Sequence, residues 1–128
     1  MAIQITNVGL NMYRSASAGN ATPLVSYVAL GTSNITPTAA DTRLGNEVFR
    51  KAVSSYVDGT TGIEYISLYI APSDAVGVNI AEIAFYGGGT ASLAPNSGTM
   101  LARGLYSHPS KTNLESIQAQ LALTFTAV

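Results

Sequence analysis

Apolar and polar residues alternate along several short segments of the sequence, with the period of two that is typical of β-strands. The clearest segment is IEYISLYIA, in which Ile66, Leu68 and Ile70 are separated by serine and tyrosine. Clusters of glycine, proline, asparagine and serine divide these segments, and Asp58-Gly59 is typical of a hairpin turn. The pattern predicts six strands, at residues 24–32, 47–57, 63–71, 79–87, 99–107 and 116–128.

One segment near the start of the chain has a helical pattern instead. Thr6 and Asn7 are both suited to cap a helix formed by VGLNMYRSASAG, and Gly19 is suited to end it, although Gly9 lowers the helix propensity. One short helix followed by six strands with hairpin-like turns predicts a mainly β fold, an antiparallel β-sandwich-like domain. No linker divides the chain, so residues 1–128 are expected to form a single domain.

The predicted strand NIAEIAFYG contains one carboxylate among apolar residues. Its alternation places Ile80, Glu82, Ala84 and Tyr86 on one face of the strand. Burying a carboxylate alone is costly, so a partner is expected for Glu82 if it is buried.

We predict that Glu82 is partly buried and pairs with Arg50 or Arg103 from another strand. Such a pair would also fix the register of the sheet, because a slip of one residue would move the charge to the opposite face. Two alternatives remain at this stage. Glu82 could meet an arginine of a neighbouring copy at a subunit interface, or it could lie exposed on a solvent face.

Charged residues are scarce, at 10% of the sequence against about 25% in a typical soluble domain. A net charge of −1 with only six lysines and arginines argues against a nucleic-acid partner, since binding many phosphates requires a basic patch. No apolar run approaches the roughly 20 residues of a membrane-spanning helix, so no membrane partner is expected. The start of the chain also lacks the pattern of a secretory signal. A surface with so little charge repulsion favours self-association and burial in an assembly.

The sequence offers little catalytic chemistry. It contains no cysteine and one histidine, His108, which lies in an SHPS segment and is predicted to be an exposed turn residue. The seven acidic residues are scattered, and Glu64 and Glu82 on neighbouring strands are the only suggestion of a carboxylate pair for glycoside hydrolysis. The YGGGT segment lacks the trailing lysine of a phosphate-binding loop. We therefore expect no enzyme activity, no catalytic residues, no metal and no cofactor.

Tyrosine supplies seven of the aromatic residues, and tryptophan is absent. A tyrosine side chain combines an apolar ring with a polar tip, which suits protein interfaces and sugar-binding faces as well as ordinary half-buried sheet positions. The possible interface aromatics are Tyr27, Tyr56, Tyr65, Tyr69, Tyr86 and Tyr106.

The order of five segments resembles the phage tail-collar fibre domain over nearly the whole chain. These segments are ITNVGLNMY, YVALGTSNITPTAADTRLGNEVFR, NIAEIAFY, MLARGLY and KTNLESIQAQLALTF. In that family the domain is the N-terminal, virion-proximal part of a tail fibre and has no known catalysis. The resemblance places Glu47, Arg50 and Glu82 at recurring charged positions, and with Arg103 these residues form the candidate set of structural ion pairs.

The resemblance implies a structural virion protein that forms a homotrimer and docks on a phage tail or baseplate through self-association. A typical member continues into a shaft and a receptor-binding tip, whereas this sequence stops at Val128, so we expect a stand-alone fibre base or an adaptor. Two alternatives stay open: a capsid decoration protein that clamps capsomers, and a carbohydrate-binding module that recognises the host. The expected partners are other copies of the chain and other proteins of the tail, baseplate or capsid.

Overall fold

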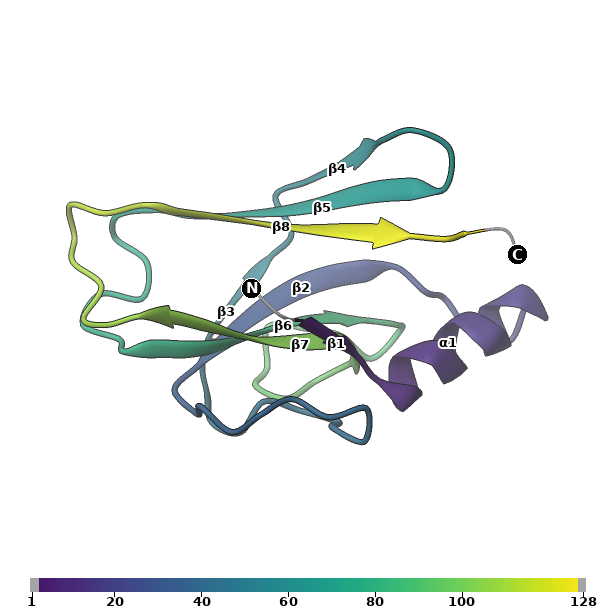
Figure 1. The fold of residues 1–128 in the computed structure, drawn as a ribbon, viewed down its shortest axis with the longest axis horizontal. Coiled ribbons are helices and arrows are strands. Elements are labelled where there is room, and N and C mark those ends of the chain that lie inside the picture. Colours follow the sequence, from purple (N-terminus) through teal and green to yellow (C-terminus); the bar gives the residue numbers. More distant parts are fainter. Residues whose placement is uncertain (1–2, 127–128) are drawn as a thin grey trace.

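The computed structural model describes residues 3–126, which form one helix and eight strands in two antiparallel sheets (Figure 1). The predicted mainly β, sandwich-like fold is therefore confirmed, with two more strands than the pattern indicated. The elements are β1 (Ile3–Ile5), α1 (Asn7–Ser17), β2 (Val25–Gly31), β3 (Glu47–Ala52), β4 (Ser55–Asp58), β5 (Ile63–Ile70), β6 (Ile80–Gly87), β7 (Thr99–His108) and β8 (Ile117–Thr124).

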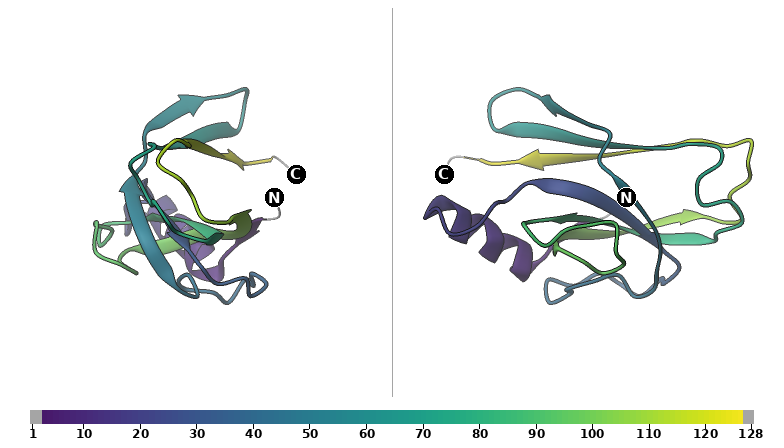
Figure 2. Two further views of the ribbon diagram at one scale, coloured as in Figure 1. Left: turned by 90° about the vertical axis from the view of Figure 1, so that its left-hand side faces the viewer. Right: turned by 180° about the vertical axis from the view of Figure 1, so that it is seen from behind.

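The two sheets are separate layers that are joined on one side, where β3 continues toward β4 (Figure 2). The larger sheet has the order β1-β7-β6-β2-β3, and the smaller has the order β4-β5-β8. Apolar side chains from both sheets fill the space between the layers. The core includes Val28, Leu30 and Phe85 from the larger sheet and Leu68 and Ile70 from the smaller, all at most 1% exposed.

The predicted strand at 47–57 is wrong as a single element, because the chain changes sheets within it. The Val53 N–H still donates to the Ser26 carbonyl of the larger sheet, at 2.9 Å, while the next N–H, of Ser54, donates to Ser67 of the smaller sheet, at 2.8 Å. Alternation of residue types continues through such a corner, so the pattern does not reveal it.

The helix begins and ends where the capping residues indicated. The Thr6 hydroxyl accepts a hydrogen bond from the Gly9 N–H at 3.0 Å, and Gly19 follows the helix with a φ of 77°. Gly9, which lowers helix propensity, is needed for packing: a Cβ there would lie 2.8 Å from the Leu101 Cα on β7. Strand β1, with only three residues, had no detectable pattern of its own.

A register shift between Ile80 and Glu82 in β6 separates these two residues onto different faces. The prediction that they share a face is therefore wrong: Ile80 joins the core between the sheets, while Glu82 lies on the outer face of the larger sheet. The last strand ends at Thr124, short of the predicted 116–128, and residues 127–128 of that prediction lie outside the described part of the chain.

Two long segments without regular structure cover the outer face of the larger sheet. Loop A, residues 32–46, connects β2 to β3, and loop B, residues 88–98, connects β6 to β7. A second apolar cluster on this face includes Leu44 from loop A, with Ala84 and Tyr86 from β6 and Met100 from β7. This face also carries the predicted charged residues.

Candidate functional site

Glu82 and Arg103 form a buried ion pair on neighbouring strands of the larger sheet. The Arg103 Nε and Nη2 atoms donate to Glu82 Oε2 at 2.9 and 2.8 Å. The Glu82 side chain is 0% exposed and that of Arg103 is 3% exposed. Of the two arginines considered from the sequence, the structure thus brings Arg103, and not Arg50, to Glu82.

The Glu82 carboxylate also binds the backbone of loop A. It accepts hydrogen bonds from the N–H groups of Ser33, Gly45 and Asn46, at 3.3, 3.0 and 2.8 Å. A Cβ on Gly31 would collide with Glu82 Oε1, so glycine at this position leaves room for the carboxylate. One buried charge therefore holds both ends of loop A against the sheet.

Arg103 extends this contact to the middle of loop A. Its Nη2 donates to the Ile35 carbonyl at 2.9 Å, and its Nη1 donates to Asp41 Oδ2 at 3.1 Å. Burial alone would raise the pKa of Asp41, but hydrogen bonds from Thr38 and the nearby Arg103 guanidinium outweigh it and hold that pKa below its ordinary value. Asp41 therefore stays ionised and fixes the loop tip.

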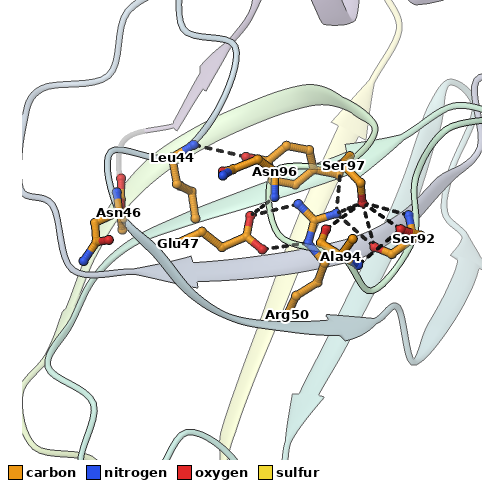
Figure 3. A network of polar contacts seen from close by, with 10 residues as sticks. Leu44, Asn46, Glu47, Arg50, Ser92, Ala94, Asn96 and Ser97 are labelled. Atoms are coloured by element: carbon orange, nitrogen blue, oxygen red, sulfur yellow. Dashed lines mark hydrogen bonds and ion pairs between the residues drawn. The ribbon is translucent and has the colours of Figure 1, made fainter.

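A second buried ion pair, between Glu47 and Arg50, lies on β3 and binds loop B (Figure 3). The Arg50 Nε and Nη2 donate to the two Glu47 oxygens at 2.9 and 2.8 Å, and the side chains are 3% and 2% exposed. Residues three apart on a regular strand face opposite ways. Glu47 and Arg50 nevertheless lie on the same face, because the pairing of β3 with β2 shifts register between Leu30 and Gly31.

Loop B is bound by both members of this pair. Arg50 Nη1 donates to the Ser92 carbonyl at 3.1 Å and to the carbonyl and hydroxyl of Ser97 at 2.8 and 2.9 Å. The Glu47 Oε1 accepts from the Asn96 N–H at 3.1 Å. The Glu47–Arg50 pair therefore holds loop B as the Glu82–Arg103 pair holds loop A.

Tyr86 connects the two ion-pair systems. The Arg50 guanidinium lies over its ring, 4.2 Å from the centroid, and its hydroxyl accepts a hydrogen bond from the Leu44 N–H of loop A at 3.1 Å. Burial raises the pKa of the Tyr86 hydroxyl. The ring is 0% exposed, so the prediction that Tyr86 is an interface aromatic is wrong: this tyrosine fills the space beneath the two loops.

The remaining candidate tyrosines do not form one surface. Tyr56 and Tyr69 are 46% and 41% exposed, and the Tyr56 hydroxyl donates to the backbone of the larger sheet at 2.5 Å. Tyr27, Tyr65 and Tyr106 are half-buried. Tyr27 packs against the outer-face cluster, and Tyr106 packs against the core between the sheets. Tyr65 and Tyr69 are both on strand β5 of the smaller sheet.

Lys111, which no sequence pattern indicated, forms a third site of buried charge beside the two ion pairs. It is 1% exposed, and its ammonium group donates to the carbonyls of Ala71, Pro72 and Thr112 at 3.1, 3.1 and 3.2 Å. These three bonds use all the donors of the group and join two turns at one end of the sandwich. A single lysine in a turn-rich segment looks like an ordinary solvated residue, so no sequence signal marked it.

Replacing Lys111 with methionine is expected to lower the free energy of unfolding by about 2 kcal/mol, because three buried carbonyls lose a charged donor. Lys51→Met is the matched control, since Lys51 forms a half-exposed ion pair with Asp74 and should contribute less than about 1 kcal/mol. Urea unfolding of both variants measures the difference. Equal losses would contradict the structural role assigned to Lys111.

Two carboxylates, the exposed Asp58 and the half-buried Glu64, lie directly opposite each other on β4 and β5. A hydrogen bond with Asp58, together with desolvation and charge repulsion, raises the pKa of Glu64 above its ordinary value of 4.5. A raised pKa means that the folded state holds this proton more tightly than the unfolded state. The stabilisation is present below pH 4.5 and is lost as the pH rises through the raised pKa.

The variant Glu64→Gln is therefore expected to melt at a higher temperature than wild type at pH 7, and the two should converge at acid pH. Thermal melts at a series of pH values, reported as variant minus wild type, isolate this pair from the other carboxylates. A variant that is less stable than wild type at neutral pH would show that the two carboxylates do not repel each other.

Among residues 3–126, no group of three histidine, cysteine or acidic side chains could hold a metal ion. His108 is half-buried at the end of β7 and not in an exposed turn as predicted: its Nε2 lies 3.1 Å from Glu115 Oε2, and its ring stacks on Tyr106. Within the same range, no helix is long and apolar enough to cross a membrane.

Comparisons with protein-family models, with curated proteins and with solved structures each found no match.

Proposed function

We propose that this chain is a structural protein of a phage virion, a short tail-fibre base or adaptor that docks on the tail or baseplate. One observation carries the proposal: the buried charges bind loops of the chain itself. The Glu82–Arg103 pair directs its remaining polar atoms to loop A. The Glu47–Arg50 pair directs its remaining polar atoms to loop B. Such groups contribute shape and rigidity to the outer face rather than reactive chemistry.

The surface that these charges hold in place is suited to docking by shape and apolar burial. Loop A presents Ile35 at 69% exposure and loop B presents Leu93 at 65% exposure. Both are apolar residues on loops whose backbones are fixed from beneath by buried arginines. A preorganised loop loses little conformational entropy on binding, which favours a stable contact in a particle.

The resemblance to tail-collar fibre domains supports the same function and a location in the virion. It also favours a threefold assembly, and the low net charge of −1 agrees with a chain that is covered by other proteins.

The test is to locate the chain in phage particles that encode it. Electron microscopy with a gold-labelled antibody is expected to place the label at the tail or baseplate. Label over the head would instead support a capsid decoration protein. Particles without label would contradict a virion function altogether.

A double variant, compared with a control, tests the docking surface itself. Ile35→Asp together with Leu93→Asp should leave folding intact, because both side chains are exposed, but should strongly reduce incorporation into particles. Leu114→Asp is the matched control, since Leu114 is 89% exposed in the segment between β7 and β8 and belongs to neither loop. Equal incorporation of all the variants would exclude loops A and B as the docking surface.

A carbohydrate-binding module is a second candidate, supported by one depression of about 410 Å³ on the smaller sheet. Its lining is uncharged and includes Ser67, Tyr69, Gln118 and Gln120, which are hydrogen-bonding side chains beside an exposed aromatic ring. A glycan array with the purified protein tests it: binding that is lost in Tyr69→Ala would support the module, and an array without binding would exclude it for the sugars present.

A further inference from the structure

The edges of the two sheets differ in how well they are protected against pairing with another strand. An exposed strand edge carries unpaired N–H and C=O groups, and proteins protect such edges with short strands, charged residues, bulges or covering loops. Edge strand β1 has three residues and β4 has four, including Asp58. Edge strand β3 carries Glu47, Arg50 and Lys51, and loop B binds over it.

Strand β8, with the sequence IQAQLALT, lacks these protections. It pairs with β5 at all eight positions without a register shift, and it contains no charged residue and no proline. Within residues 3–126, no other strand pairs with its second edge. A strand edge that is this long, regular and uncharged is a template for a further strand.

The apolar core is also incompletely covered beside β8. Ala119 and Leu123 point toward the core but are only half-buried, and so are Tyr106 of β7 and Ile5 of β1, which pack against the same core. A strand added to the edge of β8 would shield Ala119 and Leu123 further, so apolar burial and backbone hydrogen bonds would act together.

We propose that β8 pairs in antiparallel orientation with β8 of a second copy of this chain, about a twofold axis through Gln120. The occupant is a second copy because the strand is self-complementary in this register. Residues whose numbers sum to 240 face each other, so Gln120 meets Gln120 and Gln118 meets Ala122 on the outer face. On the core-facing side Ala119 meets Leu121, and Ile117 meets Leu123.

No charges oppose each other in this arrangement, and apolar residues meet apolar residues on the face toward the core. The two Gln120 side chains have the donors and acceptors to form hydrogen bonds across the axis. The two smaller sheets would become one continuous sheet with the order β4-β5-β8-β8-β5-β4. This contact goes beyond the proposed function and differs from the threefold symmetry that the resemblance implies.

The first test is the mass of the purified chain by light scattering over a dilution series. The expected particle has twice the chain mass of 13.2 kDa at high concentration and dissociates on dilution. A monomer at every concentration, or a threefold mass, would overturn the proposal. A threefold mass would leave the proposed virion function standing, so the two failures are distinguishable.

The second test places charge on the axis. Gln120→Lys puts two ammonium groups opposite each other and is expected to weaken dimerisation at least about tenfold, and Gln120→Glu should do the same with two carboxylates. Mixing the two variants should restore a dimer, because lysine then faces glutamate. Gln118→Lys is the matched control, since its lysine faces Ala122 and should change dimerisation by less than about threefold.

Gln118 and Gln120 are both exposed, so all these variants should fold, which circular dichroism and thermal melts check. Dimerisation that is unchanged in Gln120→Lys, or a mixture of the lysine and glutamate variants that stays monomeric, would overturn the pairing about Gln120.

Discussion

Replacing Glu82 with glutamine is expected to lower the free energy of unfolding by about 3 to 5 kcal/mol, the cost typical of breaking a buried ion pair by removing one partner. Glutamine has nearly the same size, so packing is preserved. Its amide NH2, however, must face donors in either orientation: the Gly45 N–H and the Arg103 guanidinium at the Oε2 position, or the Ser33 and Asn46 N–H groups at the Oε1 position. Arg103 would also remain buried with only Asp41 as an ionic partner.

Urea unfolding measures this loss, and Glu115→Gln is the matched control. That substitution removes the same charge from a carboxylate that is 40% exposed, so the midpoint should move little. If Glu82→Gln unfolded at the same urea concentration as Glu115→Gln, the buried pair could not be what holds loop A.

Replacing Arg50 with methionine is expected to cost a similar amount, about 3 to 5 kcal/mol, because the Glu47 carboxylate is left buried without its cation. Loop B also loses its bonds from Arg50 to Ser92 and Ser97. The substitution should therefore increase hydrogen exchange in loop B while loop A stays protected. Glu82→Gln should have the reverse effect on the two loops.

The double variant Glu47→Leu with Arg50→Met separates the charge effect from the loss of contacts. With neither charge buried, it should be less destabilised than Arg50→Met alone. Arg14→Met on the exposed face of α1 controls for the loss of an arginine and should have little effect. A double variant with a lower free energy of unfolding than Arg50→Met would show that Glu47 holds loop B without needing Arg50.

The parts of this fold that could be predicted from the sequence are those with local causes. Alternation identified the strand of Ile66 to Ile70, and side-chain capping by Thr6 marked the start of the helix. The partner of Glu82 could be narrowed to two arginines, because an isolated carboxylate in an apolar strand requires a cation.

The parts that could not be predicted depend on departures from regular periodicity. Regular alternation places Glu47 and Arg50 on opposite faces, and only the irregular pairing of β2 with β3 brings them together. The register shift after Ile80 and the change of sheet after Val53 are also departures from regular pairing that alternation of residue types does not reveal. The burial of Lys111 depends on carbonyls some 40 residues away in the chain, which no local pattern reports.

The central claim is that buried charges hold two irregular loops as rigid parts of the outer face, and hydrogen exchange of the wild-type protein by NMR tests it most directly. The N–H groups of Gly45 and Asn46, which bind Glu82, and of Asn96, which binds Glu47, should exchange at least about 100-fold more slowly than those of Gly89 and Thr90. The latter two form no hydrogen bond among residues 3–126. Equal, rapid exchange at all five positions would contradict the claim.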